Sequence, residues 1–357
     1  MNVGIIGAGA ISGIYLENMI HKYSNIHVSA ICANHLERAQ IKAEKYVIKA
    51  CTLDEMLQDK DIDLCVVLTP VDKHYEIIRK VLLAGKHAYT EKTISQTTTQ
   101  AKELLKIATE KNLYLGSAPD TFLGAAVQTA KKAIEDNLIG EIYSFSISIN
   151  RKNDLLTALY PFLCMPGAGV LRDYQVYYLT ALLYLLGPVR RTCAFVKAPV
   201  LSREDKIPGT RDYGKTVETP NESVVSAVLE LENGIVGTIQ QNHETIKTDL
   251  AEFNIYGRNG ILKLSNANYF GGEVRLLKDV PDLKEDVDIP PIETILEPVN
   301  DFSGNARGIG VSEMVSAYLE GRTIKASKEL AYHVLEVLES MEKSSKDGTM
   351  ETIDSRF

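Results

Sequence analysis

The chain has 357 residues, of which 45% are hydrophobic and 24% are charged, and its formal net charge at pH 7 is −8. Two domains are expected for this length, because single cores stop growing at roughly 250–300 residues. The negative charge, with no run rich in lysine and arginine, excludes a nucleic-acid partner and leaves a small-molecule substrate as the better expectation.

The chain start predicts a buried strand rather than a signal peptide. Residues 1–7 have no basic segment and no small-residue cleavage site, and no later segment has the pattern of a transmembrane helix. We therefore expect a cytoplasmic protein with no membrane partner. The five cysteines are scattered and form no Cys-x-x-Cys pair, which predicts buried thiols and no metal site.

The first third of the chain alternates short apolar runs with helical patterns such as residues 97–109. This alternation predicts βαβ units and a parallel sheet. The predicted strands are residues 3–7, 28–33, 64–69, 87–90 and 113–116.

The pattern changes after Ser117. A helix is predicted over about 124–137, and the runs that follow are joined by Glu-Asn-Gly at 232–234 and by Arg-Asn-Gly at 258–260. Such turns are typical of hairpins, so the second sheet should be mainly antiparallel. Its predicted strands are residues 142–149, 223–231, 235–241, 252–257 and 260–264. The prediction is an α/β protein with a doubly wound first domain over 1–118 and a second α/β domain, with a mainly antiparallel sheet, over 119–357.

Two later stretches lack any regular pattern. Residues 197–220 combine charges, prolines and glycines, and residues 279–303 hold Pro281, Pro290, Pro291 and Pro298. Both are predicted to be surface loops. Helices are predicted around 311–320 and 328–343, where they could pack back on the first domain, and a short polar tail follows.

A glycine-rich turn follows the first strand. Gly7 permits a tight turn, Gly9 allows a pyrophosphate to approach the backbone, and Ser12 takes the close-packing third position. The helix beginning near Ile11, with Ala10 before it, would point its first amides at the phosphates. The alternative is a glycine turn that binds nothing, but its place between a strand and a helix is the context that dinucleotide binding requires.

The end of the second predicted strand should distinguish NAD from NADP. A carboxylate there accepts hydrogen bonds from the ribose 2′-hydroxyl and repels a 2′-phosphate. The strand ends at Ala33 and Asn34, and no carboxylate comes before Glu37. Asn34 and Arg38 tolerate either cofactor, and the pattern favours NADP slightly. Alternatively, Arg38 is only a solvated helix residue.

Four stretches together are similar to the Gfo/Idh/MocA family of sugar-type dehydrogenases over nearly the whole chain. They are the glycine turn, the Thr-Pro-Val-Asp-Lys-His stretch at 69–74, the Lys-His-Ala-Tyr-Thr-Glu-Lys stretch at 86–92 and the Gly-Ala-Gly-Val-Leu-Arg-Asp stretch at 167–173 running to Tyr177. The resemblance implies a Rossmann domain followed by an α/β domain with a large open sheet, and a sugar or polyol bound above the nicotinamide. It also implies a homodimer or homotetramer, with residues 119–357 as the substrate-binding and oligomerisation domain.

The resemblance implies that Glu91 and Lys92 end a Rossmann strand and that Lys92 reaches the reacting hydroxyl. Family members usually have proline next, whereas this chain has Thr93. The other cofactor contacts implied by the resemblance are Thr69, Pro70 and His74. A histidine such as His74 is otherwise most often a solvated or capping residue.

The second motif departs further from the family pattern. Asp173 matches, but Ala168 replaces a glycine, Gln175 replaces another, and Tyr177 replaces the usual histidine. Alcohol oxidation needs a proton acceptor and a positive charge beside the developing alkoxide. The resemblance therefore implies Tyr177 as proton acceptor, Lys92 as the charge and Asp173 as the orienting group. Alternatively, the tyrosines of this helix only pack in a core.

Other functions fit the same fold. A dinucleotide-dependent sugar sensor without turnover would account for the departures at Thr93, Ala168 and Gln175, and an NAD-dependent glycosidase is a further alternative. Asp120 and Thr121, where the chain passes between the domains, are possible cleft residues.

Overall fold

A computed structural model describes residues 1–165, 167–247, 250–279 and 291–357. The chain forms two compact units. Unit 1 holds residues 1–123, 305–336 and 355–357, and unit 2 holds residues 124–304 and 337–354. The domain boundary after residue 118 stays a prediction, because these units are defined by contacts and not by independent folding. In the described residues no helix is long and apolar enough to cross a membrane.

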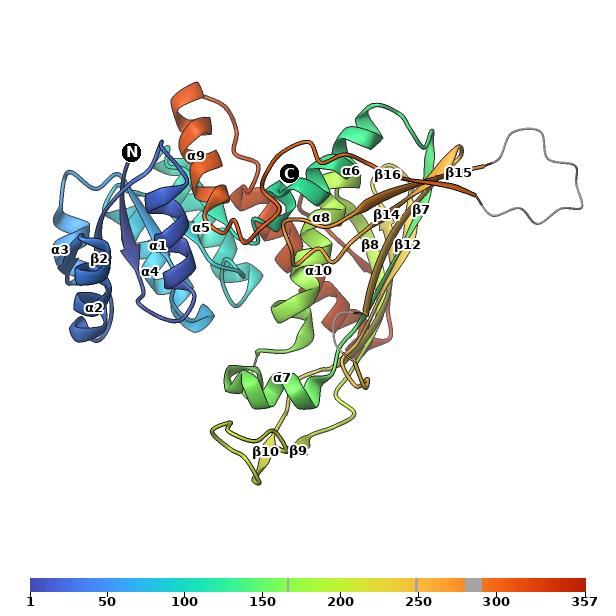
Figure 1. The fold of residues 1–357 in the computed structure, drawn as a ribbon, viewed down its shortest axis with the longest axis horizontal. Coiled ribbons are helices and arrows are strands. Elements are labelled where there is room, and N and C mark those ends of the chain that lie inside the picture. Colours follow the sequence, from blue (N-terminus) through green and yellow to red (C-terminus); the bar gives the residue numbers. More distant parts are fainter. Residues whose placement is uncertain (166, 248–249, 280–290) are drawn as a thin grey trace, which may run out of the picture. The chain divides into compact units, whose positions relative to one another are not determined.

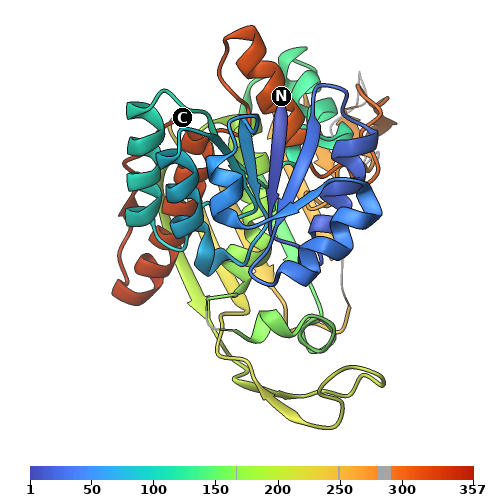
Figure 2. The ribbon, with the colours of Figure 1, turned by 90° about the vertical axis from the view of Figure 1, so that its left-hand side faces the viewer.

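Unit 1 contains a six-stranded parallel sheet in the order β3-β2-β1-β4-β5-β6, which confirms the predicted parallel sheet. The strands are short, and β1, β4, β5 and β6 are mostly buried because helices cover both faces of the sheet (Figure 2). The strands are β1 Asn2–Ile6, β2 His27–Cys32, β3 Lys49–Cys51, β4 Leu64–Val67, β5 His87–Thr90 and β6 Leu115–Ser117. β3 was not predicted from the sequence.

The helices of unit 1 include a segment from late in the chain. Those before residue 124 are α1 Ser12–His21, α2 Leu36–Tyr46, α3 Leu53–Gln58, η1 Val71–Lys73, α4 His74–Leu83, α5 Thr98–Glu110 and η2 Thr121–Leu123. Helix α9 (Ile309–Glu320) and the first half of α10 (Lys328–Asp347) join them. Asn18 Nδ2 donates to the carbonyl oxygens of Asn305 and Arg307, 2.9 Å each, so α1 holds the segment that precedes α9.

Unit 2 contains a nine-stranded sheet in the order β16-β15-β14-β13-β7-β12-β11-β8-β17, in which only β7 and β12 pair in parallel. The predicted mainly antiparallel sheet and both predicted hairpins are confirmed. The strands are β7 Ile142–Asn150, β8 Val189–Lys197, β11 Val224–Leu231, β12 Val236–Asn242, β13 Leu250–Gly257, β14 Gly260–Leu264, β15 Val274–Lys278, β16 Ile292–Ile295 and β17 Glu351–Thr352.

Helices lie along one face of the large sheet, as Figure 1 shows for α6, α8 and α10. Phe145, Ile147 and Ile149 alternate along β7 with more exposed residues and are buried beneath these helices. The helical segments of unit 2 are α6 Ala125–Glu135, α7 Asn153–Leu159, η3 Pro161–Cys164, η4 Leu171–Gln175, α8 Val176–Leu186 and the second half of α10.

The two predicted surface loops and the polar tail contain strands, so these predictions were wrong in part. Within 197–220, β9 (Ser202–Glu204) pairs with β10 (Thr216–Glu218), and within 279–303, β16 pairs with β15. β17 lies in the tail and pairs with β8. These strands bury few or none of their side chains, so they lack a hydrophobic pattern. Pro281 and Pro290 lie outside the described residues.

Candidate functional site

The glycine turn after β1 has the shape that a dinucleotide requires. Gly7 has a φ of +118°, its N–H donates to Cys32 O at 2.8 Å, and a Cβ there would lie 2.7 Å from Leu68 O. Only glycine fits both conditions. A Cβ at Gly9 would meet no atom within 4 Å, so this backbone is open to a ligand.

The start of α1 leaves its first amides without a side-chain cap. Ile11 is the N-cap residue and caps nothing with its side chain, and the first turn holds no acidic residue. Ser12 Oγ donates to Gly9 O at 2.7 Å, and this hydrogen bond stabilises the turn. Ala10 is exposed. Uncapped amides and the positive end of the helix dipole together suit a phosphate.

Asn34 and Arg38, which follow β2, are both exposed to solvent. Sequence reasoning missed Lys42, one turn after Arg38 on α2. Lys42 Nζ lies 3.3 Å from the position that a Cβ would take at Gly13, in the first turn of α1. Its i+4 spacing from Arg38 was the available signal. In the described part of the chain, neither cation has an ion-pair partner.

The end of β4 is fixed by a buried histidine. His74 is 1% exposed, with Nδ1 at 2.7 Å from Thr93 O and Nε2 at 2.9 Å from Thr69 O. Burial lowers the pKa of His74, although the two carbonyl groups act in the opposite direction. A neutral imidazole carries one N–H, so the ring donates to one of the two carbonyls at a time. His74 therefore joins the loop that begins with Thr69 and Pro70 to the loop after Lys92. Thr69 Oγ1 is buried and has no partner among the described residues.

Hydrogen bonds fix Glu91 and the residues after it at the end of β5. Tyr15 OH donates to Glu91 Oε1 at 2.8 Å, and Lys92 N donates to Glu91 Oε2 at 3.1 Å. The Lys92–Thr93 peptide bond is cis, and the buried Thr93 hydroxyl donates to Ser95 O at 2.8 Å. Thr93 is thus held in place by its own hydroxyl and by His74.

The second glycine of the Gly-Ala-Gly motif in unit 2 lies against the partly buried carboxylate of Glu222. A Cβ at Gly169 would lie 1.9 Å from Glu222 Oε2, so a larger residue there would displace this carboxylate. Glu222 Oε1 accepts from Leu171 N at 3.2 Å. Arg172 forms a bidentate pair with Glu342 of α10, in which Nη2 and Oε2 lie 2.9 Å apart. These contacts fix η4, on which Asp173 lies.

Asp173 and Tyr177 lie one helical turn apart, where η4 passes into α8. Tyr177 is 8% exposed, and its ring centroid lies 6.1 Å from that of Tyr174. Tyr174 and Tyr178 each hydrogen-bond to Asn266. Gln175 is fully buried, with Nε2 at 3.1 Å from the sulfur of Met341 and with no hydrogen-bond partner for Oε1 among the described residues.

Two residues of this cluster were missed by sequence reasoning. Arg151 follows β7 and His243 follows β12, and the parallel pairing of these strands brings both to one sheet edge. Arg151 Cζ lies 3.9 Å from the centroid of the Tyr174 ring, and the His243 ring meets the same ring edge-on at 5.9 Å. Burial, and to a smaller extent the positive charge of Arg151, lowers the pKa of His243 to about 3, although the charge of Asp173 raises it. His243 is therefore neutral.

Asp120, which the sequence suggested as a possible cleft residue, is buried in unit 1 and binds backbone amides there. It is 2% exposed, and its Oδ2 accepts from Gly308 N at 3.0 Å and Gly310 N at 3.1 Å. Its carboxylate therefore caps the start of α9. Thr121 is also buried.

Comparison with known proteins identifies relatives of both parts of the chain. Residues 1–118 match the model of the GFO/IDH/MocA oxidoreductase family, NAD-binding Rossmann fold, and residues 127–263 match the GFO/IDH/MocA C-terminal domain. An uncharacterized oxidoreductase of Schizosaccharomyces pombe is 32% identical over 157 residues, which is 43% of this chain and 42% of that protein.

The scyllo-inositol 2-dehydrogenase (NADP(+)) IolW of Bacillus subtilis is 26% identical over 217 residues, 60% of this chain and 60% of that protein. The matched region thus spans less than two thirds of either curated relative. Levoglucosan dehydrogenase in complex with NADH and levoglucosan has the same fold, with a TM-score of 0.83 at 19% identity over 99% of both chains.

Proposed function

Because this chain belongs to the Gfo/Idh/MocA family of oxidoreductases, we propose that it transfers a hydride between NAD(P) and a secondary hydroxyl or carbonyl of a sugar, a polyol or a related small molecule. Two relatives support the substrate class. One is named for scyllo-inositol and NADP(+), and the other forms a complex with NADH and levoglucosan.

The described residues of unit 1 fit a dinucleotide. The open backbone at Gly9 and the uncapped start of α1 would hold the pyrophosphate. The buried hydroxyl of Thr69, which has no partner among the described residues, could form a hydrogen bond to the cofactor. When bound, the nicotinamide supplies or accepts the hydride.

NADP is the proposed preferred cofactor. No carboxylate ends β2, and two cations, Arg38 and Lys42, lie one turn apart on the helix that follows it. These charges favour a 2′-phosphate, and Asn34 can donate to it or to a ribose hydroxyl. Equal or tighter binding of NADP than of NAD in calorimetry is the expected result.

On the substrate side, Tyr177 is the proposed proton acceptor during oxidation. The observation that supports it best is a chain of ring contacts: Tyr177 meets Tyr174, and Tyr174 meets His243, an imidazole with a pKa of about 3. His243 Nε2 lies 2.7 Å from Gln241 Nε2, which also donates to Val170 O. His243 thus accepts at Nε2 and carries its proton on Nδ1. Because an imidazole with so low a pKa is a weak base, the Tyr177 hydroxyl is the better proton acceptor.

Lys92 is proposed to supply the positive charge that stabilises the developing alkoxide, and Asp173 to orient the substrate. The backbone of Lys92 is held by Glu91, and the loop after it is held by His74. An ammonium on a fixed backbone is suited to a charge that appears only in the transition state.

The test is a panel of sugars and polyols incubated with each oxidised cofactor. An oxidoreductase reduces one cofactor for each molecule of substrate oxidised. A sensor binds both ligands without turnover, and a glycosidase releases aglycone with no net change in cofactor. Either of these last two results would contradict the proposed function.

A homodimer or homotetramer is proposed on the basis of the face of the large sheet opposite its helices (Figure 1). Its central strands carry short polar side chains there, such as Ser144, Ser146, Thr238 and Gln240. Short side chains allow sheets to stack at about 10 Å. A monomer in light scattering at micromolar concentration would contradict this proposal.

A further inference from the structure

One cation in the unit 2 cluster has no counter-ion. Arg151 is half-buried, and no carboxylate in the described part of the chain forms an ion pair with it. Its Nε is buried and has no hydrogen-bond partner there. Its guanidinium instead lies over the ring of Tyr174. A buried N–H without a partner is costly unless a ligand completes it.

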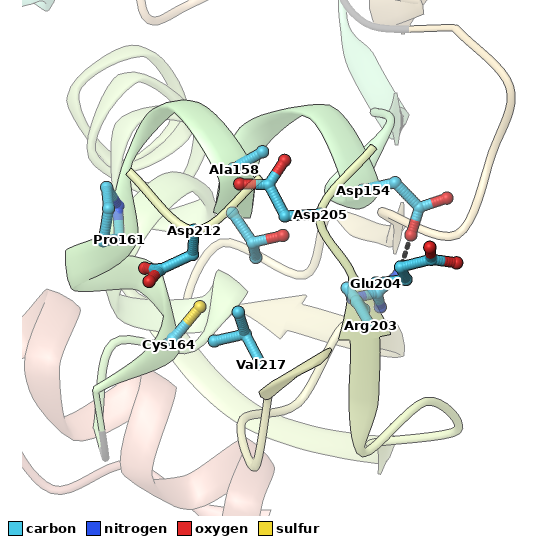
Figure 3. Close-up of a pocket in the computed structure, with 10 residues that line it drawn as sticks. Asp154, Ala158, Pro161, Cys164, Arg203, Glu204, Asp205, Asp212 and Val217 are labelled. Atoms are coloured by element: carbon cyan, nitrogen blue, oxygen red, sulfur yellow. Dashed lines mark hydrogen bonds and ion pairs between the residues drawn. The ribbon is translucent and has the colours of Figure 1, made fainter. Parts of the chain in front are cut away.

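A neighbouring arginine shows what a purely structural guanidinium looks like here. Arg203 has a side chain 6% exposed and pairs with both Asp154 and Glu244. Figure 3 shows Arg203 and Asp154 with further carboxylates, Glu204, Asp205 and Asp212, around a separate small pocket. The Nε of Arg203 is also buried without a hydrogen-bond partner among the described residues, so what distinguishes the two arginines is the ion pairing. Asp154 and Glu244 balance the charge of Arg203, whereas no carboxylate in the described part of the chain pairs with Arg151.

The groups around Arg151 define the charge that would complete the site. His243 is neutral, and its Nδ1 is a donor. Asp173 is near enough to act on His243 electrostatically. A single guanidinium without a paired carboxylate suits a monoanion better than a dianionic phosphate, and the planar fork of arginine matches a carboxylate.

We propose that the substrate is a polyhydroxy carboxylic acid, such as an aldonic or uronic acid, whose carboxylate binds Arg151 while a hydroxyl-bearing carbon is oxidised or its carbonyl reduced. This inference rests on the proposed function and narrows its substrate class. Arg151 is a binding residue in this account, and Tyr174 is a positioning residue that holds the guanidinium plane.

The experiment compares matched pairs of compounds: glucuronate with glucose, and gluconate with glucitol, with glucose 6-phosphate as the phosphate arm. For the wild type, kcat/KM should be higher for the acid in at least one pair. Arg151→Met should lower kcat/KM for that acid by about 10- to 100-fold, chiefly through KM, and leave the neutral partner nearly unchanged. Arg151→Lys should restore part of the loss, because the charge returns without the fork.

The matched control is Arg258→Met, which changes an exposed arginine in the turn between β13 and β14. It should leave both members of each pair unchanged. An equal loss for the acid and its neutral partner in Arg151→Met, or a preference for the sugar phosphate, would overturn the carboxylate assignment while the proposed function stands.

If no compound is turned over, the proposed function fails, and calorimetry with the same acids in the presence of NADP decides the assignment separately. Binding that Arg151→Met weakens by the same factor supports a carboxylate site in a sensor. Binding of no acid at millimolar concentration would refute the site.

Discussion

Replacing Asp120 by asparagine removes a charge that is buried at the start of α9. The side chain is 2% exposed, and one oxygen accepts from the amides of Gly308 and Gly310. Asparagine has nearly the same shape, and its Oδ1 can accept the same two hydrogen bonds. The substitution therefore separates the effect of the charge from that of packing.

The magnitude follows from the protonation equilibrium. Burial raises the pKa of Asp120 from 3.8 to about 6, although the two amides act in the opposite direction. This rise corresponds to about 3 kcal/mol. Because the folded state binds the proton more tightly, the contribution of Asp120 to the free energy of unfolding is greatest below pH 4. It declines as the pH rises from about 4 to about 6, and the decline should be absent in Asp120→Asn.

Amide hydrogen exchange of residues 305–320, measured for both proteins between pH 4 and pH 8, tests this reasoning. The intrinsic pH dependence of exchange cancels in the comparison. Protection should be similar at pH 4, and the variant should exceed the wild type by up to about 3 kcal/mol at pH 7.5. Equal protection at every pH, or a variant less protected at pH 7.5, would refute a buried carboxyl group that titrates near pH 6.

Four further substitutions test the site. Lys92→Met should retain folding and dinucleotide binding but lose about 100- to 1,000-fold in kcat, and an active variant would exclude the alkoxide role. Tyr177→Phe should lose about 100-fold or more in kcat at unchanged cofactor affinity, whereas unchanged turnover would leave Tyr177 as a packing residue. Ala33→Asp should shift calorimetric preference toward NAD by adding an acceptor for the 2′-hydroxyl, and a wild type that prefers NAD by more than about tenfold would contradict our interpretation of the β2 end. Arg203→Met leaves two carboxylates without their cation, one of them mostly buried. It should lower the free energy of unfolding by about 1–3 kcal/mol, measured as a lower midpoint of urea unfolding, and an unchanged midpoint would show that these ion pairs contribute nothing.

Much of unit 1 could be predicted because its determinants are local. Residue 7 must be glycine because its φ is positive and because the backbone of Leu68 leaves no room for a Cβ. A glycine between a predicted strand and a predicted helix is therefore enough to indicate this turn from the sequence. A central parallel strand such as β4 is buried on both faces, so it is a short apolar run. The place of Glu91 and Lys92 at a strand end follows from the same pattern.

Edge strands show where a local pattern fails. All four residues of β16 are exposed, so Ile292–Ile295 has no alternation of buried and exposed positions. What makes it a strand is the row of backbone hydrogen bonds that β15 offers. Such pairing depends on a distant part of the chain and is absent from the composition of the segment.

The substrate side of the site depended on tertiary structure in the same way. The sequence alone indicated Asp173 and Tyr177, because one motif and one helix hold both. Arg151 and His243 are far apart in the chain, and each follows a strand whose register with the other is set only by the folded sheet. Likewise, Asp120 meets α9 across nearly 190 residues. A sequence pattern reports which side chains share a turn or a face, whereas the charge balance of Arg151 and the protonation of Asp120 and His243 depend on burial and on distant partners, which exist only once the chain has folded.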